Sequence, residues 1–168
     1  MSQSAIDSAT QEKLDALIKQ EEGDSNHYKG LFAVFLTLAA VGMSLFHLYA
    51  AYSIVPTQVL RTVHVAFVLF LVFLSFPLTA RFKNRLMWWD VIFALASVCI
   101  AYYAISGGDD FGDRNTAPNS TDVLFGTALI LLILEAVRRT NGLILLTVTV
   151  LFLLYALFGD LLPAPWTH

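Results

Sequence analysis

LFAVFLTLAAVGMSLFHLYAAYSIV, residues 31–55, is an apolar run that contains no Asp, Glu, Lys or Arg. At about 1.5 Å per residue, a helix of this length exceeds the roughly 30 Å hydrocarbon thickness of a bilayer, so it can cross with some tilt. Pro56 follows directly, and proline cannot continue a helix without losing a backbone hydrogen bond. We therefore expect a transmembrane helix over residues 31–55.

The composition extends this expectation to the whole chain. The 168 residues are 57% hydrophobic and 14% charged, whereas about 25% of a soluble domain is charged. A soluble core of this size cannot hide several runs that are each long enough to cross a bilayer. The net charge of −3 provides no basic surface, so we expect no nucleic-acid partner. Cys99 is the only cysteine, which excludes an internal disulfide and a cysteine-rich zinc site.

Further apolar runs follow the first one. Pro77 lies near the end of the second run, where a lost backbone hydrogen bond costs least. Trp88 and Trp89 begin the third run, and indole rings suit the headgroup boundary. The fourth run is short before Arg138 and Arg139, so it spans only if its ends reach into the interface. The predicted spans after the first cover residues 62–80, 87–106, 122–138 and 143–159.

These runs predict an all-α integral membrane protein with about five transmembrane helices. Asn141 and Gly142 suit a tight turn between the last two runs. The alternative is four spans, with these two runs merged or one of them lying in the interface. Residues 107–121 read as an exposed loop that contains several Asp and Gly residues, after which Thr121 or Asp122 caps the next helix.

The polar segment 1–29 precedes the transmembrane domain, which we assign to residues 30–168. The segment lacks the basic start, apolar middle and cleavage site of a signal peptide, so we expect it to be retained. Residues 8–22 predict a short cytosolic helix, because Leu14, Leu17 and Ile18 recur at helical spacing.

The basic residues beside the runs predict the orientation, because Lys and Arg remain on the cytoplasmic side far more often than they cross. With a cytoplasmic N-terminus and five crossings, only Arg61 and Arg114 of the ten Lys and Arg residues lie outside. The C-terminus then also lies outside. The basic residues placed inside are Lys13, Lys19, Lys29, Arg81, Lys83, Arg85, Arg138 and Arg139.

Glu135 is the one acidic side chain well inside an apolar run, and Arg138 and Arg139 follow it on the same helical face. A charge at this depth is costly unless it is paired or close to the boundary. We interpret the three residues as an ion-pair cluster at the cytoplasmic boundary that fixes helix depth or docks a partner. A proton or ion relay is the alternative, but a carboxylate beside two guanidinium groups should stay ionised.

His47 and His64 lie toward the outer ends of two neighbouring predicted helices, at similar depth. A haem could bridge two such imidazoles, although neither a second pair nor a cysteine attachment motif accompanies them. The plainer interpretation is that each histidine hydrogen-bonds a neighbouring helix. We therefore expect no cofactor. The chain also lacks the known motifs of phosphate binding, metalloprotease and serine hydrolase chemistry, so we expect no enzymatic activity.

Two motifs near the end of the chain resemble a known family. LEAVRRTNG, residues 134–142, and VLFLLYALFGDLLP, residues 150–163, are similar to a junction in the permeases of tripartite ATP-independent periplasmic (TRAP) transporters, in the branch that uses TAXI-type binding proteins. RTVHVAFVLFLVFLSFP, residues 61–77, and the WWD of residues 88–90 resemble the same branch. The resemblance covers most of residues 60–163.

The resemblance implies a function that the residue patterns alone do not. In that family this region is usually the front part of a long fused permease, whose remaining helices carry the substrate and ion sites. Because the chain ends at His168, we expect a separately encoded small membrane subunit. It would be a non-catalytic, static scaffold, multi-pass in the bacterial cytoplasmic (inner) membrane, with its C-terminus in the periplasm.

The implied partners are a large polytopic permease subunit, a periplasmic TAXI-type substrate-binding protein and membrane lipid. The large subunit would be an elevator that imports organic anions by secondary active transport, driven by an ion gradient such as sodium symport. The alternatives are the small subunit of a tripartite tricarboxylate transporter, which the junction motif argues against, and a haem-anchoring subunit of a membrane oxidoreductase. We assign structural or partner-interface roles to Arg61, His64, Trp88, Trp89, Asp90, Glu135, Arg138 and Arg139, and we assign no catalytic, substrate-binding or metal-binding residue.

Overall fold

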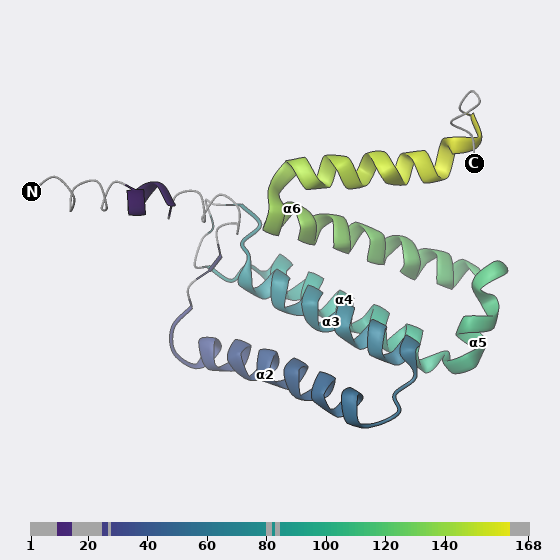
Figure 1. Ribbon diagram of the computed structural model, residues 1–168, viewed down its shortest axis with the longest axis horizontal. Coiled ribbons are helices and arrows are strands. Elements are labelled where there is room, and N and C mark those ends of the chain that lie inside the picture. Colours follow the sequence, from purple (N-terminus) through teal and green to yellow (C-terminus); the bar gives the residue numbers. More distant parts are fainter. Residues whose placement is uncertain (1–9, 15–24, 27, 80–81, 83–84, 162–168) are drawn as a thin grey trace, which may run out of the picture.

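The chain folds into long helices that run alongside one another (Figure 1). The computed structural model describes residues 10–14, 25–26, 28–79, 82 and 85–161, and these contain no strand. Four of the described helices are long and apolar enough to span a membrane, and the all-α prediction is confirmed for the described residues. The elements are α2 (Leu31–Tyr52), α3 (Thr57–Ser75), α4 (Trp88–Ser106), α5 (Gly108–Asp113), η2 (Arg114–Thr116), α6 (Ser120–Phe158) and η3 (Gly159–Leu161).

Two prolines set helix limits that differ from the predicted spans. The backbone is already extended at Ser53, so α2 ends at Tyr52 rather than at residue 55, and Pro56 caps the start of α3. At the other end, α3 stops at Ser75 rather than at residue 80, because the residue before a proline avoids helical backbone angles. Phe76, which precedes Pro77, is extended accordingly, with φ −110° and ψ 125°.

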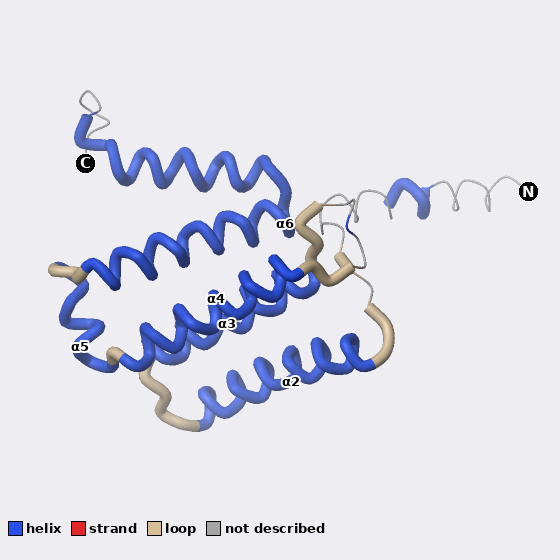
Figure 2. Tube along the Cα trace, turned by 180° about the vertical axis from the view of Figure 1, so that it is seen from behind, coloured by secondary structure: helices blue, strands red, loops and turns tan. Residues whose placement is uncertain are grey.

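The helix α6 is interrupted by a reversal at Gly142. It covers 39 residues, but Gly142 within it has φ 73° and ψ −162°, a backbone region that is open essentially to glycine alone. After this residue the chain runs back in the opposite direction (Figures 1 and 2). The turn predicted at Asn141 and Gly142 is therefore correct, and the two legs of α6, residues 120–141 and 143–158, match the fourth and fifth predicted runs.

The buried core lies among α3, α4 and the first leg of α6. Helix α2 contributes no buried residue, and among the described helices it packs against α3 alone. The second leg of α6 also contributes none, and its large side chains at Leu143, Ile144 and Phe152 are exposed. Such an apolar exterior suits lipid or another protein rather than water. The buried apolar residues are Leu69, Phe73, Leu74, Ala94, Ile100, Leu132 and Ala136.

The segment between α4 and α6 is more ordered than the predicted loop. Residues within 107–121 form α5 and η2, which continue the chain in helical turns after Gly107. The ring of Phe111 packs edge-on against Tyr103, with the ring centroids 6.1 Å apart. The cap of α6 is Asn119 rather than Thr121 or Asp122, since its Oδ1 accepts from the Asp122 backbone N–H at 2.8 Å. Of the predicted cytosolic helix, residues 10–14 are helical; the rest of 8–22 lies outside the described residues.

The reversal yields the first prediction. We expect Gly142→Ala to destabilise the fold by about 1–3 kcal/mol, because a Cβ makes the backbone angles of residue 142 strained. Gly126→Ala is the matched control: it lies in the same helix, it also has open space around an added Cβ, and alanine favours a helical backbone. Denaturant titration of the detergent-solubilised variants, followed by circular dichroism, measures the difference. Equal stability of the two variants would show that the reversal does not depend on glycine.

Candidate functional site: a buried ion-pair cluster

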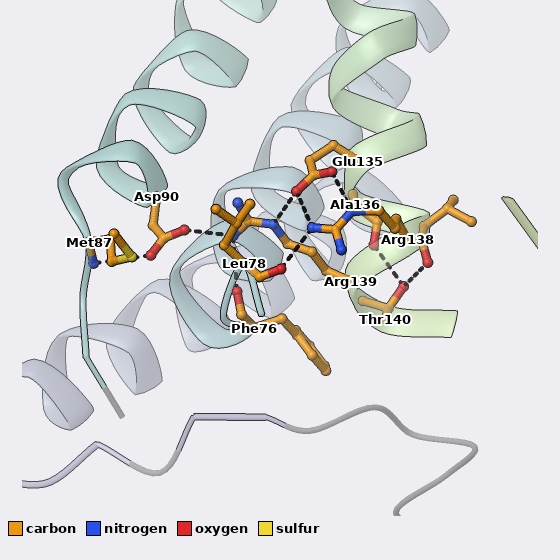
Figure 3. Close-up of polar contacts among 10 residues, drawn as sticks. Phe76, Leu78, Met87, Asp90, Glu135, Ala136, Arg138, Arg139 and Thr140 are labelled. Carbon is orange, nitrogen blue, oxygen red and sulfur yellow. Dashed lines mark hydrogen bonds and ion pairs between the residues drawn. The ribbon is translucent and has the colours of Figure 1, made fainter. Parts of the chain in front are cut away.

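Arg139, near the end of the first leg of α6, lies at the centre of a polar cluster (Figure 3). Its Nη1 donates to Oδ1 of Asp90 at 2.7 Å and to the carbonyl oxygen of Phe76 at 3.1 Å. Its Nε donates to Oε1 of Glu135 at 2.8 Å. The side chains of Arg139 and Asp90 are 0% and 2% exposed. One guanidinium therefore joins α6, the segment after α3 and the start of α4.

Two aromatic rings enclose the same guanidinium. Its central carbon lies 5.1 Å from the ring centroid of Phe73 and 5.6 Å from that of Phe93. These distances are within the range of cation–π attraction, which strengthens when the cation is desolvated. The Nη2 of Arg139 is buried without a hydrogen-bond partner among the described residues. The electron-rich ring faces therefore provide part of the electrostatic stabilisation of this nitrogen's charge.

Asp90 has a second role at the start of α4. Its Oδ2 accepts a hydrogen bond from the backbone N–H of Met87 at 3.1 Å, which closes the first turn of the helix. A carboxylate in the first turn also interacts favourably with the positive end of the helix dipole. The Asp90 side chain therefore both neutralises Arg139 and stabilises the first turn of α4.

The segment before α2 closes over this end of the bundle. The backbone N–H of Asn26 donates to the carbonyl oxygen of Ser75 at 2.7 Å, and the Asn26 side chain donates to the hydroxyl of Tyr28 at 2.9 Å. Burial, followed by the negative charge of Asp90, raises the pKa of the Tyr28 phenol. The chain entering the first helix is thus tied to the end of α3, close to the cluster.

Glu135 and Arg138 form the more exposed part of the cluster. Arg138 donates to both carboxylate oxygens of Glu135, from Nε at 2.7 Å and from Nη2 at 2.8 Å, and Nη2 also donates to the carbonyl oxygen of Leu78 at 2.8 Å. The side chains of Arg138 and Glu135 are 30% and 23% exposed. The predicted pairing on one helical face is confirmed. With Asp90 and Arg139 the formal charges of the cluster sum to zero.

The remaining predicted residues lie outside the cluster. Trp88 and Trp89 begin α4 and are 60% and 42% exposed, with their rings stacked 3.7 Å apart between centroids. Arg61 is exposed on α3 and borders a groove that Thr62 also lines. His64 contacts His47 on α2 instead. Of the eight residues, the structure brings together Asp90, Glu135, Arg138 and Arg139.

Several participants in the cluster were not predicted from sequence. The carbonyl oxygens of Phe76 and Leu78 are acceptors because α3 ends at Ser75, and carbonyls beyond a helix terminus have no intrahelical donor. Pro77 was the available signal, since a proline at the end of an apolar run frees carbonyl groups around it. The rings of Phe73 and Phe93 carried no signal that distinguishes them from other core residues.

A second ion pair lies at the opposite end of the first leg of α6. Arg114 donates to both oxygens of Asp122, from Nε at 3.1 Å and from Nη2 at 3.3 Å. The hydroxyl of Tyr103 donates to Asp122 Oδ1 at 2.7 Å. This contact fastens the connection between α4 and α6. Sequence reasoning used Arg114 only to predict orientation and did not anticipate the pair.

His47 and His64 meet between α2 and α3, as their predicted depths implied. His64 Nδ1 lies 3.0 Å from His47 Nε2, and the ring planes stand at 82°. A haem between two imidazoles needs about 4 Å between the ligating nitrogens, at roughly 2 Å per metal–nitrogen bond, and a slot for a flat macrocycle. In the structure the two imidazoles are in direct hydrogen-bond contact instead, and no slot of this kind lies between them.

The described fold defines the class only coarsely: it is all-helical, with helices long and apolar enough to span a membrane and an ion-pair cluster at one end. Comparison with protein-family models, curated proteins and solved structures finds no match to the chain. No group of three or more His, Cys, Asp or Glu residues gathers as a metal site within the described part of the chain.

The buried pair gives the second prediction. We expect Asp90→Asn to destabilise the fold by about 3–5 kcal/mol, because removal of one partner leaves an uncompensated buried charge. Asp110→Asn, at an exposed position in α5, makes the same chemical change without touching the cluster. The stability of the two variants is compared by unfolding each of them in detergent with increasing SDS. A loss for Asp90→Asn no larger than that for Asp110→Asn would contradict the central role of the pair.

Proposed function

We propose that this chain forms the small membrane subunit of a TRAP-type transporter and serves as a static scaffold for an elevator-type large subunit. The observation that carries the proposal is the part that the junction motif plays in the fold. Glu135, Arg138 and Arg139 belong to the LEAVRRTNG segment that resembles the TAXI branch, and they form the buried cluster that holds α3, α4 and α6 together. A motif whose residues hold the helices of the chain together fits a scaffold better than a transport pathway.

The distribution of polar groups supports a non-catalytic role. The two described ion-pair clusters lie at opposite ends of the first leg of α6, and the groove beside the larger cluster has only one charged lining residue, Glu135. A transporter's own substrate site combines midplane polar groups with broken helices. In the proposed complex, the organic anion and the coupling ion bind the large subunit, and the periplasmic binding protein delivers the anion.

A scaffold must also resist movement through the bilayer. Trp88 and Trp89 are exposed at the start of α4, where indole rings anchor a helix at the headgroup level. The charged cluster lies at the same end of the bundle and opposes its displacement into hydrocarbon. In the proposed complex, the exposed apolar side chains of the second leg of α6, such as Leu151, Phe152 and Leu157, face the large subunit or lipid.

We propose five crossings of the bacterial cytoplasmic membrane, with a cytoplasmic N-terminus and a periplasmic C-terminus. The reversal at Gly142 supports separate crossings by the two legs of α6. At about 1.5 Å per residue, the legs measure about 33 Å and about 24 Å, and the shorter one spans with its ends in the interface. The cluster then lies at the cytoplasmic face, together with most of the basic residues.

Co-purification tests the proposal. We expect the affinity-tagged chain, expressed together with its genomic neighbours and extracted in mild detergent, to retain a large polytopic permease subunit through affinity and size-exclusion steps. Tagging the permease instead provides the reciprocal experiment. If neither direction recovers a permease although both chains are present in the membrane, the scaffold proposal fails.

Substitution of Glu135 distinguishes a structural role of this residue from a role in a proton or ion relay. We expect Glu135→Ala to lower the yield of the assembled complex, because it leaves Arg138 and Arg139 without their shared carboxylate near hydrocarbon. Asp160→Ala, at an exposed position beyond the second leg, is the control and should leave the yield unchanged. A normal yield of complex combined with lost transport in reconstituted vesicles would instead assign Glu135 to a proton or ion relay.

A further inference from the structure

The contact between His47 and His64 fixes which nitrogens carry protons. His47 Nδ1 lies 2.8 Å from the carbonyl oxygen of Met43, and a carbonyl only accepts, so Nδ1 must be the protonated nitrogen. In the neutral ring Nε2 then has a free lone pair, which accepts from His64 Nδ1 at 3.0 Å. The structure therefore presents a histidine whose Nε2 lone pair is aimed at a second imidazole on the neighbouring helix.

This arrangement matches the support that metal-binding histidines have. A ligating imidazole usually donates its other N–H to a backbone carbonyl or carboxylate, which fixes the tautomer and aims the lone pair at the metal. The carbonyl of Met43 supplies that support to His47 without any rearrangement. His64 needs only to move its proton from Nδ1 to Nε2 to present a second lone pair at the same point.

The surroundings of the pair select the kind of ion. An open groove is lined by Met43, Ser44, His47, Leu48 and His64, and none of the five is a carboxylate or a permanent cation. The groove therefore supplies two imidazoles and a thioether as neutral ligands. A thioether together with imidazoles is a soft ligand set, and soft ligands select Cu(I).

We propose that His47, His64 and Met43 form a binding site for a soft monovalent metal ion, Cu(I) or its analogue Ag(I), between α2 and α3. The ion replaces the hydrogen bond between the imidazoles: His47 Nε2 and His64 Nδ1 ligate it, and the Met43 thioether is the third ligand. The nitrogens separate from 3.0 Å to about 4 Å, on the basis of metal–nitrogen bonds of about 2 Å, which rotation of the side chains provides.

Occupation of the site would fasten α2, which lies at the periphery of the bundle. Helix α2 has no buried residue and packs against α3 alone among the described helices. A metal held by side chains from both helices adds a cross-link, and an ion that binds only the folded state raises its stability. This inference does not depend on the proposed transporter role, and either can fail without the other.

Cu(I) binding tests the site directly. The parent protein carries His27→Gln and His168→Gln, so that only the paired histidines remain, and it is titrated anaerobically in detergent with Cu(I) against a colorimetric Cu(I) chelator. We expect one Cu(I) per chain in the parent and at least tenfold weaker binding in His64→Gln and in Met43→Leu. Met87→Leu makes the same change of side chain away from the groove and should bind as the parent does.

Thermal unfolding with and without Ag(I) compares each variant with itself, so a difference in stability between variants does not affect the test. We expect Ag(I) to raise the unfolding temperature of the parent and of Met87→Leu, but not that of His64→Gln or Met43→Leu. If His64→Gln does not fold, Met43→Leu and the parent decide the outcome. The proposal is overturned if the parent binds no Cu(I), if Met43→Leu and His64→Gln bind as tightly as the parent, or if Zn²⁺ binds more tightly than Cu(I).

Discussion

The guanidinium of Arg139 must remain neutralised in a place that water does not reach. Its side chain is fully buried, and burial of an unpaired charge in a low-dielectric interior costs several kcal/mol. Asp90, Glu135, the Phe76 carbonyl and two aromatic rings meet that requirement together. Because these partners belong to different segments, one charge holds together the segment after α3, the start of α4 and the first leg of α6.

The bundle therefore has a secured centre and a less secured periphery. Ion pairs fasten both ends of the first leg of α6, at Asp90–Arg139 and at Arg114–Asp122, and apolar side chains pack between them. Helix α2 and the second leg of α6 lie outside this core and expose large apolar side chains. A core held by ion pairs, with apolar helices at its sides, is compatible with the scaffold role that we propose.

Local features of this fold could be predicted from sequence, and contacts between distant segments could not. Hydropathy located the helices, and the spacing of Glu135 from Arg138 and Arg139 predicted their ion pairs, because residues three and four apart share a helical face. The pair between Arg139 and Asp90 joins residues 49 positions apart, and nothing in the pattern specifies such a contact. Residues 107–121 were predicted as a loop because their Asp and Gly residues are typical of loops, and the packing of Phe111 on Tyr103 is not apparent from the sequence pattern.

The separation of Asp90 and Arg139 along the chain imposes an order on biosynthesis. The two partners are 49 residues apart, so at about 5–20 residues per second the ribosome completes Asp90 roughly 2–10 s before Arg139. During that interval α3 and α4 are already made, but the carboxylate at the start of α4 has no counter-ion. The contact between α4 and the first leg of α6 through Asp90 and Arg139 can therefore form only after the first leg has been made.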